Sequence, residues 1–463
     1  MSSLSSSIVR RFVFPLWLAR DHPHCSAYLR EFERTQFFDS RDLKALQLER
    51  LRKLLAHAYQ QCPFYRRRMD DVGLSPSRRI SAQQFSAMPV LTKTDIQQNG
   101  ADLLARDFPT SNRVRNQTGG STGSPLQFYV DKERFDSRKA STMRHNRWAG
   151  LQPGDWCATL WGARLDQLLG GGFWHWCRNN FLYRTVELNT SRVSSEDWKC
   201  FVAELRRKRP QFLIAYTQSA VLFAQYLAEQ AIDDIRFRSI ITTAEVLLPG
   251  QRELLERAFH GRVFNRYGCR EVSVIASECE CHTGLHVNAD ALLLEIVPDP
   301  SIPAPSGRIV VTDLLNLSMP LIRYEIGDVG AWADRPCPCG RSLPLLTGVQ
   351  GRITDFLTLR DGCRVSGPSL TLVIADMPDV SQVQFVQRSP ELVALRVVPG
   401  RGYGARTEAE LRRRLALYLG AGMTLDIEET EHIPRELSGK YRFVINEVPA
   451  ELAVSAAATV TGG

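Results

Sequence analysis

Three hydroxyl side chains and three glycines lie within six residues, Thr118 to Gly123, in the run Gln117-Thr-Gly-Gly-Ser-Thr-Gly-Ser-Pro125. Since glycine lacks the Cβ atom that disfavours positive φ, such a loop can fold tightly around an anion. Its backbone N–H groups and its hydroxyl groups can then all point at phosphate oxygens. The next residues, Leu126 to Val130, alternate like a strand. The run predicts a phosphate-binding loop before a strand, with a flexible Ser/Gly surface loop as the alternative.

Two common phosphate motifs do not account for this loop. The P-loop of NTPases ends in Gly-Lys-Ser/Thr, and no lysine follows Gly123. The dinucleotide-binding fingerprint needs its glycines between a strand and a helix, with an acidic residue about 20 positions further on. The loop therefore indicates a different class of nucleotide site.

Further motifs follow the loop along the chain. Each is weak alone, because Tyr-Gly at a strand end is usually a turn and Gly-Lys is common. In order they are Ile241-Thr-Thr-Ala-Glu245, Arg266-Tyr-Gly-Cys-Arg-Glu271, Pro320-Leu-Ile-Arg-Tyr-Glu-Ile-Gly-Asp328, Gly351-Arg352 and Pro434-Arg-Glu-Leu-Ser-Gly-Lys-Tyr-Arg442.

Together, in this order and spacing, the motifs resemble those of the adenylate-forming superfamily of acyl-CoA synthetases, luciferases and peptide-synthetase adenylation domains. The resemblance spans roughly residues 110 to 445. The segments Leu51 to Tyr65 and Leu91-Thr-Lys-Thr-Asp95 look like the phenylacetate–CoA ligase branch, and within it like capsule-biosynthesis-type members. The resemblance implies ATP and Mg²⁺ as cofactors and a small-molecule carboxylic acid as substrate.

The chemistry of this superfamily explains the residue types. A carboxylate attacks the α-phosphorus of ATP and expels pyrophosphate, so cationic and hydrogen-bonding groups must stabilise the phosphate oxygens. By resemblance, Lys440 bridges the carboxylate and the α-phosphate, Glu271 binds Mg²⁺, and Tyr267 packs on adenine. Asp328 would accept hydrogen bonds from the ribose hydroxyls, and Arg352 would approach the ribose from the hinge. The full set of nucleotide-binding residues implied is Thr118, Gly119, Gly120, Ser121, Thr122, Gly123, Ala244, Glu245, Tyr267, Gly268, Asp328 and Arg352.

The sequence departs from the family pattern at three places. The phosphate loop lacks the lysine common near its end and has Ser124 and Leu126 instead. Arg270 stands where threonine or serine is frequent, which would bring a permanent cation close to the α-phosphate, and we count it among the catalytic residues. Thr354 occupies the place of the usual hinge Asp or Lys.

Cysteines and histidines give a second signal. Cys279-x-Cys281 with His282 and His286 lies upstream of Cys337-Pro-Cys339-Gly. Two such pairs could close one tetrahedral Zn²⁺ site, and free, partly buried thiols are the alternative. The likeness to the phenylacetate–CoA ligase branch selects the ligands Cys279, His286, Cys337 and Cys339, with Cys281 as the main rival. A closed site with four protein ligands would be structural.

Aromatic residues precede the adenine motif and could line an acyl pocket, although aromatic side chains more often belong to a core. They are Trp161, Phe173, Trp174, Trp176 and Tyr216. We predict a compact, aromatic or short acid as substrate.

Composition limits the partners. The chain has 463 residues, 44% of them hydrophobic and 23% charged, which is typical of a globular protein with two or more domains. The net charge of +8 is spread along the chain, so it suits nucleotides rather than a nucleic acid. The sequence leaves the oligomeric state open, with a homodimer as one alternative.

The N-terminus and the cysteines bear on the compartment. No apolar stretch approaches the roughly 18 residues of a transmembrane helix. Arg10-Arg11 followed by Phe12 to Ala19 mimics a signal peptide, but it contains a proline and lacks a clear cleavage site. We interpret it as part of the mature protein that packs onto the main domain, with contact to a membrane surface as the alternative. Eleven cysteines, an odd number, do not indicate a secreted disulfide framework, so we expect a cytoplasmic protein.

Strand-like and helical patterns must position these motifs. Leucines at three- and four-residue spacing predict a helix over 41–69, ended by Gly73 and Pro76. From about 126 to 330 strand-like runs (212–215, 239–242, 308–312) alternate with helical patterns (218–229, 249–259), which predicts an α/β fold with mixed sheets. We expect a large ATP- and acyl-binding domain, 1–350, with a helical extension over about 1–100. A small mobile α+β domain, 351–463, would carry the catalytic lysine and a helix over 407–419.

The sequence thus predicts a two-domain Mg-ATP-dependent carboxylate ligase that forms an acyl adenylate and transfers the acyl group to coenzyme A or another thiol. An amide or ester synthetase that uses an amine or hydroxyl acceptor without coenzyme A is one alternative. A non-catalytic nucleotide-binding scaffold is another, but it would have no need for Lys440, Glu271 and Asp328 together.

Overall fold

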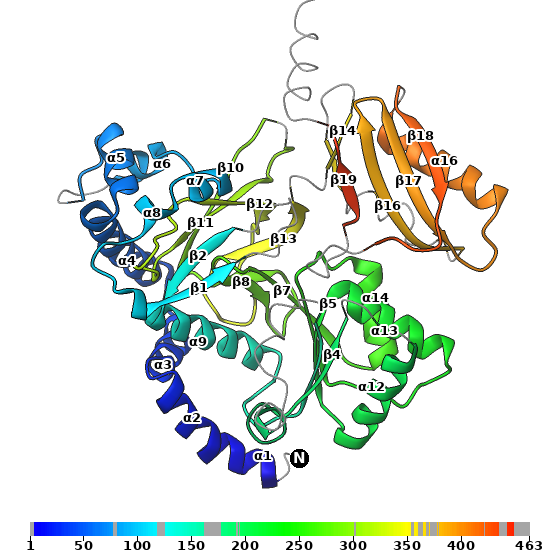
Figure 1. The fold of residues 1–463 in the computed structure, drawn as a ribbon, viewed down its shortest axis with the longest axis horizontal. Coiled ribbons are helices and arrows are strands. Elements are labelled where there is room, and N and C mark those ends of the chain that lie inside the picture. Colours follow the sequence, from blue (N-terminus) through cyan, green and yellow to red (C-terminus); the bar gives the residue numbers. More distant parts are fainter. Residues whose placement is uncertain are drawn as a thin grey trace, which may run out of the picture.

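The protein is a mixed α/β molecule, as predicted (Figure 1). The computed structural model describes residues 4–76, 81–117, 126–161, 177–190, 193, 195–300, 302–352, 356–359, 364–366, 370, 377, 379–420, 422–434 and 442–448. None of the described helices is both long and apolar enough to cross a membrane.

Helices dominate the first hundred residues. Their bounds are α1 (Leu4–Ile8), η1 (Val9–Val13), α2 (Phe14–Asp21), α3 (Cys25–Thr35), α4 (Ser40–Gln61), α5 (Pro63–Asp71), α6 (Ala82–Ala87), α7 (Lys93–Gln98) and α8 (Gly100–Leu103). The hydroxyl of Tyr65 on α5 donates to the carbonyl of Pro320 (2.8 Å) and accepts from the backbone N–H of Ile322 (3.1 Å). This helical layer therefore fixes the segment that leads to Asp328.

The prediction of one helix over 41–69 is wrong in one respect, because the helix is interrupted at Cys62. Cys62 is extended (φ −115°, ψ 107°), and Pro63 begins α5 at a position where a missing N–H costs nothing. No leucine lies between Leu55 and Leu74, so the leucine spacing carries no information about this break.

Eleven strands form one large sheet in the order β10-β11-β12-β13-β9-β8-β7-β6-β5-β3-β4. Five are β3 (Cys157–Trp161), β4 (Thr185–Asn189), β5 (Phe212–Tyr216), β6 (Ser239–Thr243) and β7 (Arg262–Cys269), and these pair in parallel. The others are β8 (Ser273–Glu278), β9 (Leu285–Val287), β10 (Leu292–Val297), β11 (Gly307–Asp313), β12 (Tyr324–Trp332) and β13 (Leu345–Arg352), joined by antiparallel pairing.

The two halves of the sheet meet at β7, which is parallel to β6 and antiparallel to β8. Helices cover the parallel half, as Figure 1 shows for α12 (Ser195–Lys208), α13 (Thr217–Glu229) and α14 (Pro249–Phe259). A core of buried aromatic and aliphatic side chains fills the space between these helices and the strands, with Trp198, Phe223 and Phe259 among its largest members. The carboxyl ends of β5, β6 and β7 share one edge, which is where ligands bind in open α/β sheets.

A two-stranded hairpin carries the predicted phosphate loop. Strands β1 (Arg113–Gln117) and β2 (Gln127–Asp131) pair antiparallel, with Gln117 opposite Gln127. The loop residues, Thr118 to Gly123, connect the two strands and lie outside the described residues. Helix α9 (Lys132–Trp148) follows directly, with Asp131 as its N-cap.

The C-terminal part contains a separate four-stranded sheet, coloured orange and red in Figure 1, in the order β18-β17-β16-β19. Its elements are β16 (Val380–Ser389), β17 (Leu392–Pro399), α16 (Ala405–Leu419), β18 (Thr424–Glu429) and β19 (Val444–Asn446), beside the short pair β14 (Phe356–Thr358) and β15 (Arg364–Ser366). Leu411, Leu415 and Leu419 of α16 belong to one buried cluster with Phe385 and Leu395 of the sheet. These contacts give the C-terminal part its own hydrophobic core.

Candidate active site and metal centre

The turn after β6 is fixed by the helix beside it. Ala244 adopts a left-handed conformation (φ 70°), which is rare for a residue with a side chain. The Glu245 carboxylate accepts the backbone N–H of Gln218 (2.7 Å), and its carbonyl accepts the Thr217 hydroxyl (3.2 Å). Because these groups begin α13, the carboxylate also faces the positive end of the helix dipole. Glu245 therefore shapes the predicted nucleotide-binding turn through its backbone and its contact with the helix.

Tyr267 and Asp328, 61 positions apart in sequence, lie in direct contact. The Tyr267 hydroxyl donates to Asp328 Oδ2 at 2.6 Å, across from β7 to β12. Asp328 is 9% exposed and lies opposite Arg352 in the register of β12 and β13. Gly268 allows the close approach of β8, since a Cβ there would lie 2.6 Å from the Ser273 carbonyl oxygen. Four of the predicted nucleotide-site residues thus come from three strands of one sheet.

Arg270 and Glu271 form the turn between β7 and β8, beside the base of the phosphate loop. Arg270 Nη1 donates to the carbonyl of Gln117 at 3.3 Å, the last described residue before the loop. The Tyr324 hydroxyl donates to Glu271 Oε1 at 3.0 Å, and the Glu271 side chain is buried. The last described residue before the loop thus contacts the cation predicted to act on the phosphates, and the predicted Mg²⁺-binding carboxylate belongs to the same turn.

Two arginines of α9 hold this turn by its backbone, a feature that sequence reasoning missed. Arg138 donates to the carbonyl oxygens of Arg270, at 3.1 Å, and of Glu271. Arg134, one helical turn earlier, donates to the next carbonyl at 3.3 Å. Both guanidinium groups are buried and share Asp313, at 2.8 Å from Arg134 and 3.6 Å from Arg138. Burial, together with the neighbouring Arg134, lowers the pKa of Arg138 to about 10.

We predict that Arg138 positions the Arg270–Glu271 turn for Mg·ATP. Arg138→Lys keeps the charge but removes the forked donors, leaving at least one buried carbonyl unpaired, which typically costs about 1–3 kcal/mol. The Mg²⁺ concentration for half-maximal pyrophosphate exchange should rise about tenfold, with the KM for the acid little changed. Arg147→Lys on the same helix, whose guanidinium binds Glu33 at the surface, is the matched control. An unaltered Mg²⁺ requirement in Arg138→Lys would contradict this role.

An aromatic pair lies at the carboxyl edge of the parallel strands. Trp161 and Tyr216 end the neighbouring strands β3 and β5, and their ring centroids are 4.5 Å apart. The other aromatic residues proposed for the acyl pocket, Phe173, Trp174 and Trp176, lie outside the described residues. The two rings lie at the same edge of the sheet as the nucleotide motifs.

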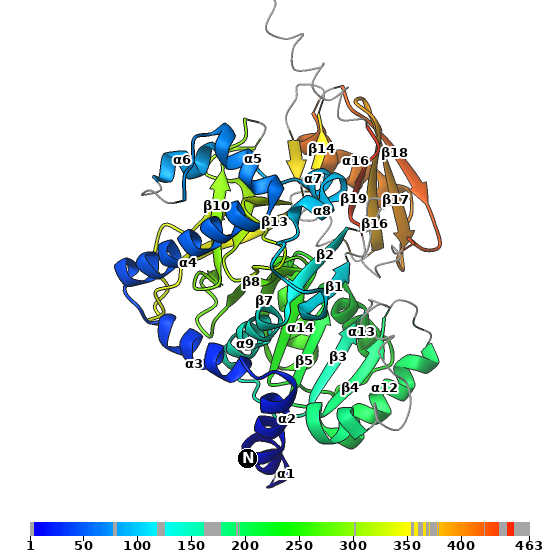
Figure 2. The ribbon, with the colours of Figure 1, turned by 60° about the vertical axis from the view of Figure 1, so that its left-hand side comes forward.

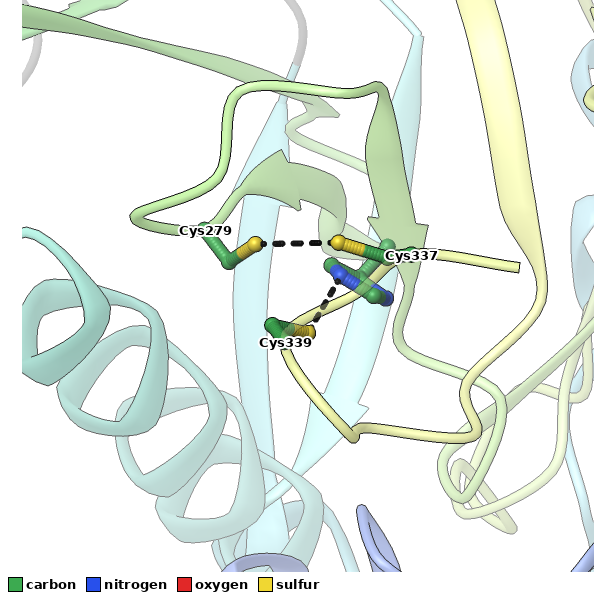
Figure 3. Close-up of side chains that lie close together, drawn as sticks. Cys279, Cys337 and Cys339 are labelled. Atoms are coloured by element: carbon green, nitrogen blue, oxygen red, sulfur yellow. Dashed lines mark hydrogen bonds between the residues drawn. The ribbon is translucent and has the colours of Figure 1, made fainter. Parts of the chain in front are cut away.

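The predicted metal ligands converge. One ligand atom from each of Cys279, His286, Cys337 and Cys339 lies within 4.8 Å of every other. The Sγ atoms of Cys279 and Cys337 are 3.5 Å apart and face each other in Figure 3. Cys339 Sγ lies 3.3 Å from His286 Nε2. At metal–ligand distances of about 2.0–2.3 Å, tetrahedral Zn²⁺ needs ligand separations of roughly 3.5–3.8 Å, so this donor set fits zinc.

The surroundings of the cluster also suit a metal. Burial lowers the pKa of His286 to about 4, which keeps the imidazole neutral, and its other nitrogen faces the Leu343 carbonyl at 3.4 Å. Cys281, the rival ligand, is not in the group of four and instead donates its backbone N–H to Cys279 Sγ at 3.4 Å. Gly340, directly after Cys339, has φ 82°, the left-handed conformation that glycine adopts readily.

Comparisons with known proteins show which proteins this chain resembles. Residues 357–447 match the family model of the CapK C-terminal domain. The chain is 28% identical over 352 residues to the phenylacetate-coenzyme A ligase of Thermus thermophilus, covering 73% of this chain and 76% of the relative. It is 24% identical over 426 residues to protein CapK of Staphylococcus aureus, covering 91% and 92%.

The chain is thus similar in sequence to phenylacetate–CoA ligases and to CapK. A crystal structure of 2-hydroxyisobutyryl-CoA ligase, in the postadenylation state with R3-HIB-AMP, superposes with a TM-score of 0.74 and 23% identity, covering 93% of this chain and 94% of that one. The chain described here therefore has the fold of the adenylate-forming CoA ligases, as its motifs predicted.

Some predicted site residues belong to parts of the chain outside the described ranges. Lys440 and the loop residues Thr118 to Gly123 lie outside the described residues, and only the backbone of Arg352 is described. Their roles remain predictions from the sequence motifs.

Proposed function

We propose that the protein is a Mg-ATP-dependent carboxylic acid ligase that makes an acyl adenylate and transfers the acyl group to coenzyme A or another thiol. The contact that carries the proposal is the hydrogen bond from Arg270 to Gln117, since it joins the Arg-Glu turn to the base of the phosphate loop. The homologous phenylacetate-coenzyme A ligases support this chemistry. We propose a cytoplasmic location and leave the oligomeric state open.

Two displacements would make up the reaction. A carboxylate oxygen forms a bond to the α-phosphorus of ATP while the bond to the β-phosphate oxygen breaks and pyrophosphate leaves. The acceptor thiol then loses its proton and attacks the acyl carbon, and AMP leaves with the electron pair of the acyl–oxygen bond. Mg²⁺, when bound, would neutralise phosphate charge.

The chain's own residues would position the reactants. Glu271 would present its carboxylate to Mg²⁺. Its side chain accepts a hydrogen bond from Tyr324, and the arginines of α9 hold the backbone of its turn. Asp328 would accept the ribose hydroxyls, and the Tyr267 ring would pack on adenine with its hydroxyl held by Asp328. Arg270 and Lys440 would supply positive charge along the path of the carboxylate toward the α-phosphate. A structural Zn²⁺ ion would be held by Cys279, His286, Cys337 and Cys339.

A compact acid remains our proposal for the substrate, and it gives a second prediction. The rings of Trp161 and Tyr216 would favour a planar group by about 1 kcal/mol beyond area burial, while each added methylene would meet filled space at a cost of roughly 1–3 kcal/mol. ATP–pyrophosphate exchange should therefore be fastest with benzoate or phenylacetate, slower with hexanoate and slowest with palmitate. Palmitate as the best of the four acids would contradict the prediction.

The same assay separates the proposed function from its alternatives. Acid-dependent exchange distinguishes a ligase from a nucleotide-binding scaffold, which would show none with any acid. Product analysis with coenzyme A, hydroxylamine or a primary amine then distinguishes a thiol acceptor from the amide and ester alternative. Thioester formation that saturates with coenzyme A at micromolar to millimolar concentrations is the expected result.

A further inference from the structure

The N-terminal helical segment exposes an apolar face. Leu4, Ile8, Phe12 and Leu16 recur every fourth residue and are 81%, 47%, 62% and 73% exposed. At helical spacing these residues share one face over about 18 Å. With Val13, this short segment holds five of the eleven large apolar side chains that are exposed in the described part of the chain. We call the four residues at fourfold spacing the apolar stripe.

The opposite face fixes the segment to the main body, as the sequence predicted for the segment as a whole. Arg10 donates to the Pro153 carbonyl (3.0 Å) and forms an ion pair with Asp155 (2.7 Å). Packing at Gly154 is so close that a Cβ there would lie 2.5 Å from the Ser6 carbonyl oxygen. The apolar stripe is therefore presented in a defined direction and is not the surface of a loose tail.

Charge along the segment indicates what covers the stripe. No acidic residue occurs between Leu4 and Arg20, and Asp21 already pairs with Arg20 at 2.8 Å. Arg11 is exposed and lies near the middle of the stripe. If a second copy packed its stripe against this one about a twofold axis, the two Arg11 side chains would meet without an acidic partner from either segment. An anionic surface would instead offer a counter-charge to each cation.

We propose that Leu4–Asp21 is an interfacial anchor that places its apolar stripe in the headgroup region of a membrane containing anionic lipids. A helix with an apolar face beside basic side chains binds membranes in this way, lying in the plane of the interface. Figure 2 shows α1 and α2 at the lower end of the molecule and the strands β16–β18 at the upper end. Attachment through the stripe would thus leave the C-terminal part unobstructed, and it does not depend on the proposed ligase activity.

Vesicle flotation of the full-length protein tests the proposal. Wild-type protein should float with vesicles of phosphatidylcholine and phosphatidylglycerol, and less with phosphatidylcholine alone. Phe12→Ser combined with Leu16→Ser should weaken binding at least about tenfold, because the apolar area available for insertion falls sharply. Phe37→Ser, which removes a 57% exposed side chain outside the segment, is the matched control and should bind like wild type. Arg11→Glu should weaken binding only to the anionic vesicles.

Several outcomes would overturn the anchor. Wild-type protein that does not float with either vesicle, or a Phe12→Ser/Leu16→Ser protein that floats as well as wild type, would do so. A vesicle-free dimer in light scattering that dissociates in the double variant would show that a second copy covers the stripe. An unchanged melting temperature of the double variant would show that the substitutions do not impair folding. Because flotation needs no substrate, its result does not depend on whether the ligase proposal is correct.

Discussion

Replacing Lys440 with alanine should lower the rate of adenylate formation by a factor of about 10²–10³ while ATP binding and the melting temperature stay close to wild type. A cation between the incoming carboxylate and the α-phosphate acts where two anions meet, and losing such a group from a water-poor site typically costs about 3 kcal/mol or more. ATP–pyrophosphate exchange with the preferred acid measures this step directly.

Controls make the Lys440 result specific. Arg401→Ala removes an exposed cation from the same C-terminal part and should leave exchange unchanged. The rate of acyl transfer from a supplied acyl adenylate should fall much less in Lys440→Ala than the rate of adenylate formation, because the lysine is expected to move away after adenylation. Near-normal exchange in Lys440→Ala would argue against both this role and the adenylation mechanism.

The sequence predicted the elements whose signals are local. Helix α14 begins and ends at Pro249 and Phe259, as its pattern indicated, because a proline at its start and a histidine in left-handed conformation after its end mark the bounds. Strands β5 and β6 were found because short runs rich in apolar and β-branched residues form them, and most of these residues are buried. The break at Pro63 was missed because the leucine pattern ends at Leu55 and the residues of α5 were assigned to the same helix without a pattern of their own.

The site was predictable only where a motif carries the function in its own side chains. Tyr267 and Asp328 belong to such motifs, although only the fold shows that they touch. Arg138 was missed because its partners in the turn are backbone carbonyls, which every residue has and no sequence pattern marks. The apolar stripe has a visible period of four, but the same period also describes a buried helix face. Which face is covered depends on the surface around Gly154 and on the Arg10–Asp155 ion pair, and the period of four shows neither of them.

Loss of the metal should destabilise the fold before it affects the chemistry. We expect close to one zinc per purified chain, and Cys337→Ser or Cys339→Ser should remove the metal and several kcal/mol of local stability. The cluster joins the ends of β8 and β9 to the 337–343 segment, which in turn contacts the N-terminal helices. There Ser342 donates its backbone N–H to the carbonyl of Gln36 at 2.9 Å. Without the metal, these separate segments would lose the metal–ligand bonds that connect them.

Metal analysis and thermal melting of matched cysteine variants decide this prediction. Cys200→Ser, at an exposed free cysteine on α12, should keep both its zinc and its melting temperature. Cys281→Ser should keep most of its zinc, because Cys281 contributes a backbone N–H to the cluster, which serine also has. If Cys281→Ser lost the metal while Cys279→Ser kept it, the ligand set would be wrong. Purified protein without zinc, or unchanged melting in both Cys337→Ser and Cys339→Ser, would exclude a structural zinc site. Three buried donors and one half-buried donor connect separate segments there, so the removal of their ion must lower the stability.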